Sequence, residues 1–277
     1  MNIISVSEIK QLLAKHGASP TKYLGQNFLI NPSVLHHIIE ASDITPEDTV
    51  LEIGPGLGVL TRALAQKAKR VIAVEKDRSM VKILEDTLKE FKNVQVICQD
   101  ALLYQNNLTN YKIVANIPYY LTSALIRKFL EEKEKPSSIV LLIQKEVAQR
   151  ICEKPPRLSL LGTSVQFYAT PKIITHVSKE SFWPAPSIDS SVIKITPVTR
   201  DNAPASEDFF TVVKAGFSHP RKQLVNNLCI LKSKNGVTLD KYTVSSWLLQ
   251  NHIAPESRAQ TLSIEQWILL TKTFPNL

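Results

Sequence analysis

The chain has 277 residues, 44% of them hydrophobic, which is enough for a sizeable core in one or two domains. Its formal net charge of +8 favours an acidic partner such as nucleic acid. No apolar run approaches the ~20 residues that span a bilayer, the N-terminus lacks the pattern of a secretion signal, and the three cysteines have no zinc-site or disulfide spacing. We therefore expect a soluble cytoplasmic protein without a metal site or a membrane partner.

Apolar periodicity predicts the elements of the first two thirds of the chain. A helix is expected over residues 7–15, and Asn31 before Pro32 predicts the N-cap and first position of a second helix. Strands are then expected over 49–53, 71–75, 94–98, 113–115 and 139–143, and helices between them over 59–67, 79–90 and 123–130. Such alternation is typical of βαβ units, so we expect an α/β Rossmann-like sheet, mainly parallel, with helices on both faces. Residues 172–177 and 191–195 predict two further strands at an antiparallel edge.

The last third of the chain has a different pattern. Residues 197–204 are polar, contain two prolines and show no periodicity, which is typical of a linker. Beyond them no strand is evident. Helices are expected over 207–217, 221–228, 242–250 and 264–273. We therefore expect two domains, an α/β domain over 1–198 and a small all-α domain over 199–277.

Three of the chain's eight glycines, Gly54, Gly56 and Gly58, directly follow the first expected strand of the sheet. Glycine there lets the backbone turn sharply and approach a ligand closely. A dinucleotide fingerprint would have its third glycine where this chain has Val59. The spacing therefore favours a cofactor without a pyrophosphate, such as S-adenosylmethionine.

Two carboxylates end the next strands in order. Glu75 is placed to accept from both ribose hydroxyls of a nucleoside-type cofactor, and Asp100 from its adenine amine. Each feature alone has a structural explanation, because the glycines could form only a tight turn, Glu75 could be a solvated strand end and Asp100 could be a helix N-cap. Their order along one sheet edge favours the cofactor pocket.

A second pocket is predicted beside the first, from Asn116-Ile117-Pro118-Tyr119. This segment also follows a strand. The Asn116 side-chain oxygen and the Ile117 carbonyl could accept the two N–H groups of an adenine amine and orient its lone pair at a methyl group. Pro118 stiffens the turn, and Tyr119 offers a face for the base to stack on. The alternative is an ordinary proline turn with a core tyrosine.

With both pockets assembled, the chain closely resembles the rRNA adenine dimethyltransferase family of small-subunit ribosome biogenesis, in its bacterial form. The motifs that carry the resemblance run nearly end to end, and their order is highly specific. They are residues 24–29 (LGQNFL), 52–58 (EIGPGLG), 116–120 (NIPYY), 144–148 (QKEVA) and 182–192 (FWPAPSIDSSV).

The resemblance implies a Rossmann-like S-adenosylmethionine-dependent methyltransferase that transfers four methyl groups to two adjacent adenosines near the 3′ end of small-subunit rRNA. It further implies that Asn27 and Leu29 touch the cofactor. The remaining implied cofactor positions are Gly54, Glu75, Asp100 and Asn116, and Gly56 belongs to the same loop. Phe182 matches an aromatic residue thought to cover the other face of the target base; the alternative is a core aromatic before a proline-rich turn.

The RNA partner is expected to be an immature small subunit, bound by a monomer. Candidate phosphate contacts, which could also be solvated surface charges, are Lys145, Arg150, Arg157, Arg221 and Lys222. One departure from the family is Gln260, where an acidic residue is usual; it puts in doubt a local contact of the helical domain, not catalysis.

Three other functions share parts of this pattern. A macrolide-resistance methyltransferase of large-subunit rRNA has both pockets, but Asp189-Ser190-Ser191-Val192 fits the small-subunit group better. A non-catalytic rRNA-binding assembly factor would not need the acceptor and carboxylate residues that are present. A DNA adenine methyltransferase would need a target-recognition insertion, and none is obvious.

Overall fold

The computed structural model describes residues 5–201, 203–233 and 236–275; residues 1–4, where no secretion signal was expected, lie outside them. The chain divides into two compact units, one of Met1–Gln149 with Ala169–Pro197 and one of Arg150–Tyr168 with Val198–Leu277. Residues 150–168 therefore associate with the C-terminal part, whereas the expected boundary assigned them to the first domain. As a division between functional domains, the boundary after residue 198 stays a prediction.

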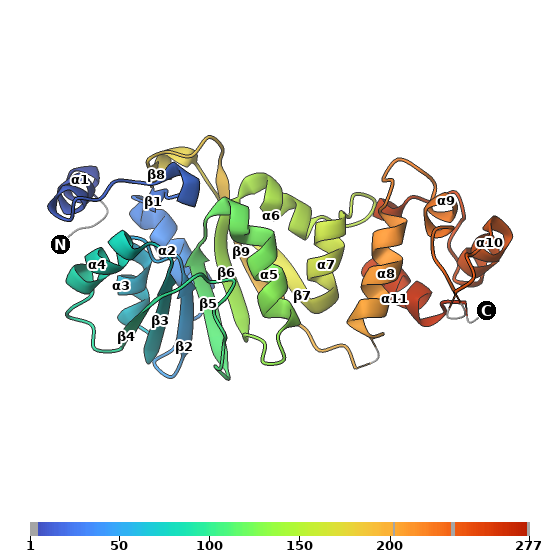
Figure 1. The fold of residues 1–277 in the computed structure, drawn as a ribbon, viewed down its shortest axis with the longest axis horizontal. Coiled ribbons are helices and arrows are strands. Elements are labelled where there is room, and N and C mark those ends of the chain that lie inside the picture. Colours follow the sequence, from blue (N-terminus) through green and yellow to red (C-terminus); the bar gives the residue numbers. More distant parts are fainter. Residues whose placement is uncertain (1–4, 202, 234–235, 276–277) are drawn as a thin grey trace. The chain divides into compact units, whose positions relative to one another are not determined.

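A seven-stranded sheet forms the first unit, in the order β4-β3-β2-β5-β6-β9-β7 (Figure 1). The parallel strands are β2 (Thr49–Ile53), β3 (Arg70–Glu75), β4 (Val94–Cys98), β5 (Tyr111–Asn116) and β6 (Ser138–Gln144). The two antiparallel strands are β9 (Ser190–Pro197) and β7 (Ala169–Val177). The parallel sheet with an antiparallel edge is thus confirmed.

Helices cover both faces of this sheet (Figure 1). They are α2 (Pro32–Ala41), α3 (Val59–Ala65), α4 (Arg78–Thr87) and α5 (Thr122–Glu131). α2 and α3 share an apolar cluster with the sheet on one face. α5 joins two strands that step across the sheet in the opposite direction, so a right-handed crossover places it on the other face. Asn31 caps α2 as predicted, because its side chain accepts the Ser33 N–H at 3.0 Å.

A small strand pair that the periodicity did not predict joins two of the sequence motifs. β1 (Phe28–Leu29) pairs antiparallel with β8 (Phe182–Trp183), so that Leu29 lies opposite Phe182. The preceding helix, α1 (Val6–Lys15), buries its apolar face together with Phe28. The LGQNFL and FWPAP segments are therefore neighbours in space, although about 150 residues separate them in the chain.

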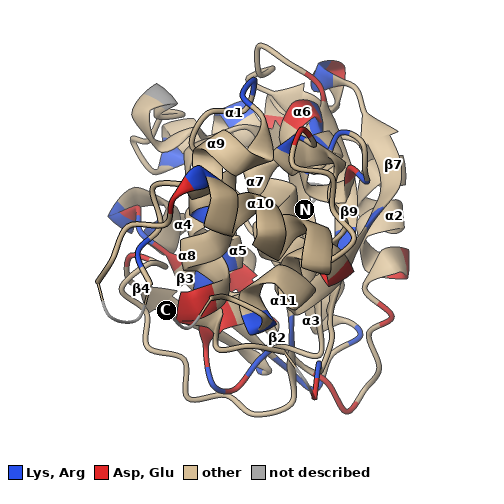
Figure 2. Ribbon diagram, turned by 90° about the vertical axis from the view of Figure 1, so that its right-hand side faces the viewer, with Lys and Arg blue, Asp and Glu red and all other residues tan. Residues whose placement is uncertain are grey.

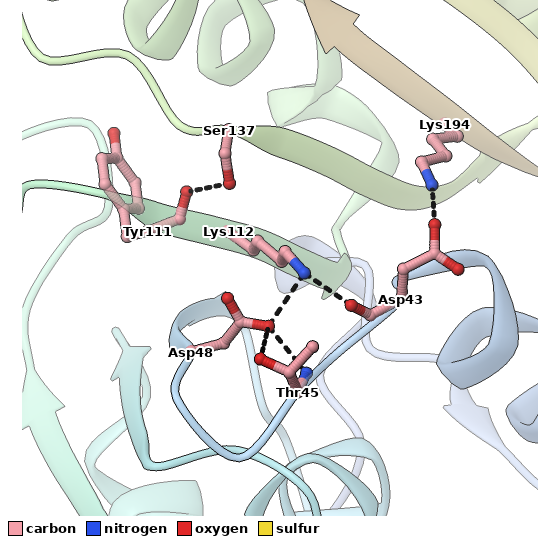
Figure 3. Close-up of polar contacts among 7 residues, drawn as sticks. All are labelled: Asp43, Thr45, Asp48, Tyr111, Lys112, Ser137 and Lys194. Carbon is pink, nitrogen blue, oxygen red and sulfur yellow. Dashed lines mark hydrogen bonds and ion pairs between the residues drawn. The ribbon is translucent and has the colours of Figure 1, made fainter.

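Basic and acidic residues are interspersed along the ribbon (Figure 2). Several of them pair near the amino ends of the parallel strands. Lys112, at the start of β5, donates to the Asp48 carboxylate at 2.8 Å and to the Asp43 carbonyl at 2.6 Å (Figure 3). Lys194 of β9 pairs with the Asp43 carboxylate. These bonds tie the loop before β2 to the sheet, and they leave the carboxyl ends of the strands to the site described below.

The second unit is helical. Its helices are α7 (Leu160–Tyr168), α8 (Ser206–Gly216), α9 (Leu224–Leu228), α10 (Lys241–Gln250) and α11 (Ile264–Lys272). Phe167 of α7 stacks on Phe209 of α8 at 3.9 Å between ring centroids, which explains why residues 150–168 belong to this unit. Among its described residues only the Lys232–Thr238 bridge is of the β type. The expected small all-α part is confirmed, with α9 three residues shorter at its start than predicted.

α6 (Lys145–Cys152), which the sequence did not predict, runs from the first unit into the second. None of the helices in the described ranges combines the length and the apolar composition that a membrane crossing requires.

Candidate active site

A pocket opens at the carboxyl ends of β2, β3, β4 and β5, where open α/β sheets bind their ligands. Four segments contribute most of its lining, namely residues 24–29, 52–57, 99–101 and 116–121. All seven predicted cofactor residues lie there: Asn27, Leu29, Gly54, Gly56, Glu75, Asp100 and Asn116. Ile117, Pro118 and Tyr119 line the same pocket. The structure therefore brings the two predicted pockets together, while the roles of the individual residues stay predictions.

The glycine loop has the backbone that its sequence requires. Gly54, Gly56 and Gly58 have φ angles of +68°, +57° and +84°, a region that residues with a Cβ rarely adopt. A Cβ on Gly56 would also lie 3.3 Å from the Phe28 ring. The loop is thus a bare stretch of backbone at the pocket wall, which can approach a ligand closely.

Glu75 is tied to this loop and is nearly buried. Its Oε2 accepts the Gly56 N–H at 3.1 Å and its Oε1 accepts the Asp77 N–H at 2.9 Å. Burial raises the pKa of Glu75, and these two backbone bonds oppose the shift. Each carboxylate oxygen keeps a second lone pair. Glu75 is therefore held in one orientation and can still accept hydroxyl groups from a ligand.

Asp100 carries two partners already. Its Oδ2 pairs with Lys76 at 2.8 Å, and its Oδ1 accepts the Leu102 N–H at 2.9 Å. The bond to Lys76 lowers the pKa of Asp100, so the carboxylate stays ionised. The bond from the Leu102 N–H shows that Asp100 stabilises a local turn, a role close to the helix N-cap that was the alternative interpretation of this residue. A ligand amine would have to use a remaining lone pair.

The orientation of the Asn116 amide is set by Asn27. The Nδ2 of Asn116 donates to the Asn27 carbonyl at 3.2 Å. This bond leaves Oδ1 of Asn116 without a partner among the described residues, and an amide oxygen can only accept. Next to it, Ile117 buries its side chain and the ring of Pro118 fixes its φ, at −55°, so the backbone that carries the Ile117 carbonyl is held in place. A fixed acceptor therefore lies at the end of β5.

The two aromatic residues of the predicted base pocket differ in their surroundings. Tyr119 lies half-buried at the pocket, and its hydroxyl is 2.7 Å from that of Ser190. Phe182 is only 3% exposed, packs in the core cluster under α2 and is not among the lining residues. In this conformation Phe182 offers no open ring face to a base. Its stacking role stays a prediction that requires the segment around β8 to move.

Glu52 is a pocket residue that the sequence interpretation missed. It is 1% exposed, lines the pocket from β2, and its Oε2 has no partner among the described residues. Burial raises its pKa to about 8, and repulsion from Glu75 adds to the shift. A carboxyl group inside the buried run Val50-Leu51-Glu52-Ile53 was the available signal, because such a group is almost never buried without a reason.

The five candidate phosphate contacts fall in different units. Lys145 begins α6 in the first unit, and its N–H donates to the Asp189 carbonyl at 3.0 Å. The other four, Arg150, Arg157, Arg221 and Lys222, are exposed in the second unit. No ion pair joins any of these five side chains to a carboxylate in the part of the chain that the structure describes. Their role in binding RNA stays a prediction.

The described residues contain no cluster of three His, Cys, Asp or Glu side chains that could hold a metal ion. The departure at Gln260 lies within the second unit. There the Gln260 carbonyl accepts the Leu158 N–H at 3.1 Å, which links residues before α7 to the turn before α11. Gln260, the expected departure from the family, thus belongs to the short 3-10 helix Ala259–Thr261.

Comparisons with known proteins all indicate the same family. A model described as ribosomal RNA adenine dimethylase matches residues 18–274. A ribosomal RNA small subunit methyltransferase A from Dehalococcoides mccartyi (strain BAV1) is 41% identical over 271 residues, covering 95% of this chain and 91% of the relative. A protein of the same name from Bacillus licheniformis is 41% identical over 276 residues, covering 95% of this chain and 94% of the relative.

Two solved structures extend the comparison. A dimethyladenosine transferase from Plasmodium falciparum has a TM-score of 0.74 at 27% identity, covering 88% of this chain and 95% of that one. The 23S rRNA methyltransferase ErmE has a TM-score of 0.73 at 24% identity, covering 89% and 99%, and at this identity it supports the fold alone. With a family model over nearly its whole length and relatives at 41% identity, this chain belongs to the ribosomal RNA adenine dimethylase family.

Proposed function

We propose that this chain transfers methyl groups from S-adenosylmethionine to the exocyclic amines of two adjacent adenosines near the 3′ end of small-subunit rRNA, four in total. The observation that carries the proposal is the fixed, unpartnered Oδ1 of Asn116 in the pocket that also contains Glu75 and Asp100, all among the described residues. A methyl donor and an amine acceptor would meet there. The named relatives act on small-subunit rRNA, and their 41% identity over nearly the whole chain supports the same substrate here.

The pocket fits the proposed cofactor in three respects. The glycine loop lines the pocket with bare backbone in the positive-φ region, which lets a ligand approach closely. Glu75 is held by two backbone N–H groups and retains acceptor capacity for ribose hydroxyls. Glu52 supplies a buried carboxyl oxygen without a partner among the described residues, which suits a cationic ligand. When bound, S-adenosylmethionine supplies an electrophilic methyl group on a sulfonium.

The residues at the end of β5 prepare the amine. The lone pair of the target adenine's exocyclic amine is delocalised into the ring. The nitrogen becomes nucleophilic when it turns tetrahedral, because the lone pair is then localised on it. Asn116 Oδ1 and the Ile117 carbonyl would accept the two N–H groups and favour that geometry. Tyr119 would hold the base by stacking. No strong general base is required, because the nitrogen can release its proton after it has gained the methyl group.

Replacing Glu75 with alanine is expected to weaken cofactor binding by roughly 1–3 kcal/mol, since hydrogen bonds to a charged group are lost. The change also removes the acceptor that holds the Gly56 N–H. Glu75→Gln keeps one acceptor oxygen and should lose less. Titration calorimetry with S-adenosylmethionine measures both variants, and a dissociation constant equal to that of the original chain would contradict the role.

In this proposal the RNA is bound by the four exposed arginine and lysine residues of the second unit and by Lys145 of the first unit. Changing Arg221 and Lys222 to glutamine should weaken binding to small subunits. The slope of the logarithm of the binding constant against the logarithm of the salt concentration should become shallower by about one for each phosphate that is no longer neutralised. Lys214→Gln on α8 is the matched control, because it removes one exposed charge of the same unit. A salt slope that the pair leaves unchanged, or that Lys214→Gln changes equally, would contradict the assignment.

The whole proposal is tested by supplying labelled S-adenosylmethionine with purified, undermethylated small ribosomal subunits, and in parallel with large subunits and naked DNA. Label in dimethyladenosine of the small subunit alone is the expected result. Label in the large subunit, with macrolide resistance in cells that express the chain, would assign it to the resistance methyltransferases instead. Cofactor binding without label in any substrate would leave a binding role in subunit assembly.

We further propose that the chain acts in the cytoplasm, as a monomer.

A further inference from the structure

The proposed stacking residue, Tyr119, begins a weakly anchored turn. The short 3-10 helix Tyr119–Leu121 has no buried residue, and Tyr120 beside it is 58% exposed. Stacking holds a base in a defined plane only if the ring itself is fixed. The one side-chain hydrogen bond of Tyr119 in the described structure is to the hydroxyl of Ser190, at 2.7 Å.

Ser190 is a rigid anchor. It is fully buried and is the first residue of β9, where it pairs with Gln144 of β6 on one side and Val177 of β7 on the other. The preceding residue, Asp189, is held as well, because its carbonyl accepts the Lys145 N–H at 3.0 Å and its carboxylate accepts the Lys179 N–H at 3.1 Å. The hydroxyl at the far end of the Tyr119 ring is therefore bound to the sheet.

The neighbouring serine has a different partner. Ser191 is equally buried, but its hydroxyl is 2.8 Å from Nδ1 of His176, a residue of β7. Successive residues of a strand point to opposite faces, which explains why only Ser190 meets Tyr119. The pair Ser190-Ser191 thus contains one serine that bonds to the pocket residue Tyr119 and one equally buried serine that does not.

We propose that Ser190 is a positioning residue of the methyl transfer: by its hydrogen bond to Tyr119 it fixes the ring on which the adenine stacks, so that the amine meets Asn116 Oδ1 and the Ile117 carbonyl. This inference rests on the function proposed above. Burial also raises the pKa of Tyr119, so the phenol keeps its proton and remains able to take either part in the bond. The bond between Tyr119 and Ser190 involves none of the predicted cofactor-binding residues.

The test compares Ser190→Ala, Tyr119→Phe, the double variant and the control Ser191→Ala in transfer to small subunits. Tyr119→Phe retains the ring and loses only the hydroxyl. Each of the two single variants should lower kcat about tenfold, with little change in KM and in the dissociation constant of S-adenosylmethionine. The double variant should be no slower than either single one, because both remove the same bond. Ser191→Ala should keep a kcat close to that of the original chain.

A second measurement follows the ring without methyl transfer. Quenching of 2-aminopurine, placed at the target position of a short RNA, reports stacking, and it should weaken in Ser190→Ala and Tyr119→Phe but not in Ser191→Ala. Effects of the two changes that multiply in the double variant, or equal losses in both serine variants, would overturn the positioning role. So would normal turnover of Ser190→Ala beside an active original chain. If the original chain transfers no label to small subunits, the proposed function and this inference both fail.

Discussion

Replacing Asn116 with alanine is expected to lower the rate of methyl transfer by about a hundredfold to a thousandfold, the range found when a fixed polar group that acts on the reacting atoms is removed. The side-chain oxygen is the only acceptor of the pair that a substitution can delete, since the Ile117 carbonyl belongs to the backbone. Oδ1 is free for the amine because Nδ2 is engaged by the Asn27 carbonyl at 3.2 Å. Single-turnover transfer to undermethylated small subunits measures the loss.

The affinity for S-adenosylmethionine distinguishes a role of Asn116 as acceptor for the target amine from a purely structural role. Alanine also removes the bond to Asn27, which lies in the segment of residues 24–29 that lines the cofactor side. We expect S-adenosylmethionine to bind only a few-fold more weakly, because one neutral hydrogen bond contributes about 1 kcal/mol. Asn116→Asp is the variant to compare with Asn116→Ala, since aspartate keeps acceptor oxygens at this position and loses the N–H group that donates to the Asn27 carbonyl. Normal turnover in Asn116→Ala would refute the acceptor model.

Local patterns were sufficient to predict the sheet and the positions around it. The period of the apolar residues identified each parallel strand, and polar or glycine residues after those strands fall at one edge because parallel strands share a direction. The sequence therefore placed Gly54, Glu75 and Asp100 in one predicted pocket and Asn116 in a second pocket beside it, and in the structure all four line one pocket. The same patterns located Asn31 at the start of α2, where the cap bond is observed.

Contacts between distant segments left no local pattern. β1 and β8 have two residues each, too few for a period, so the pairing of Leu29 with Phe182 was not predictable. It also buries Phe182, and the resemblance alone did not indicate that. The hydroxyl bond between Tyr119 and Ser190 joins two motifs 71 residues apart. Residues 150–168 were assigned to the first domain because nothing in their own sequence reveals the stacking of Phe167 on Phe209.

Glu52 should make the stability of the protein depend on pH in one specific window. Burial raises its pKa from the ordinary 4.5 to about 8. Between these values the folded chain holds a proton that the unfolded chain has lost. The free energy of unfolding therefore falls as pH rises from about 4.5 to about 8, and this contribution is fully present only below 4.5. For a completely buried carboxyl group the change is on the order of a few kcal/mol.

Glu52→Gln removes this titration, because glutamine stays neutral at every pH. We expect the variant and the original chain to have similar free energies of unfolding near pH 5, and the variant to be more stable by a few kcal/mol near pH 9. Urea unfolding of both chains at several pH values gives the difference, in which the other titrating groups cancel. A difference that stays constant with pH would mean that Glu52 is ionised throughout and has an unrecognised partner.

The same carboxyl group links pH to the ligand. A cation in the pocket favours the ionised form, so binding of S-adenosylmethionine should lower the pKa of Glu52 and release a proton near pH 7. Titration calorimetry in buffers of different ionisation enthalpy counts that proton, and Glu52→Gln should release none while binding more weakly. Because Oε2 of Glu52 is buried beside the glycine loop, an equal proton release in both chains would show that the cationic part of the ligand lies away from β2.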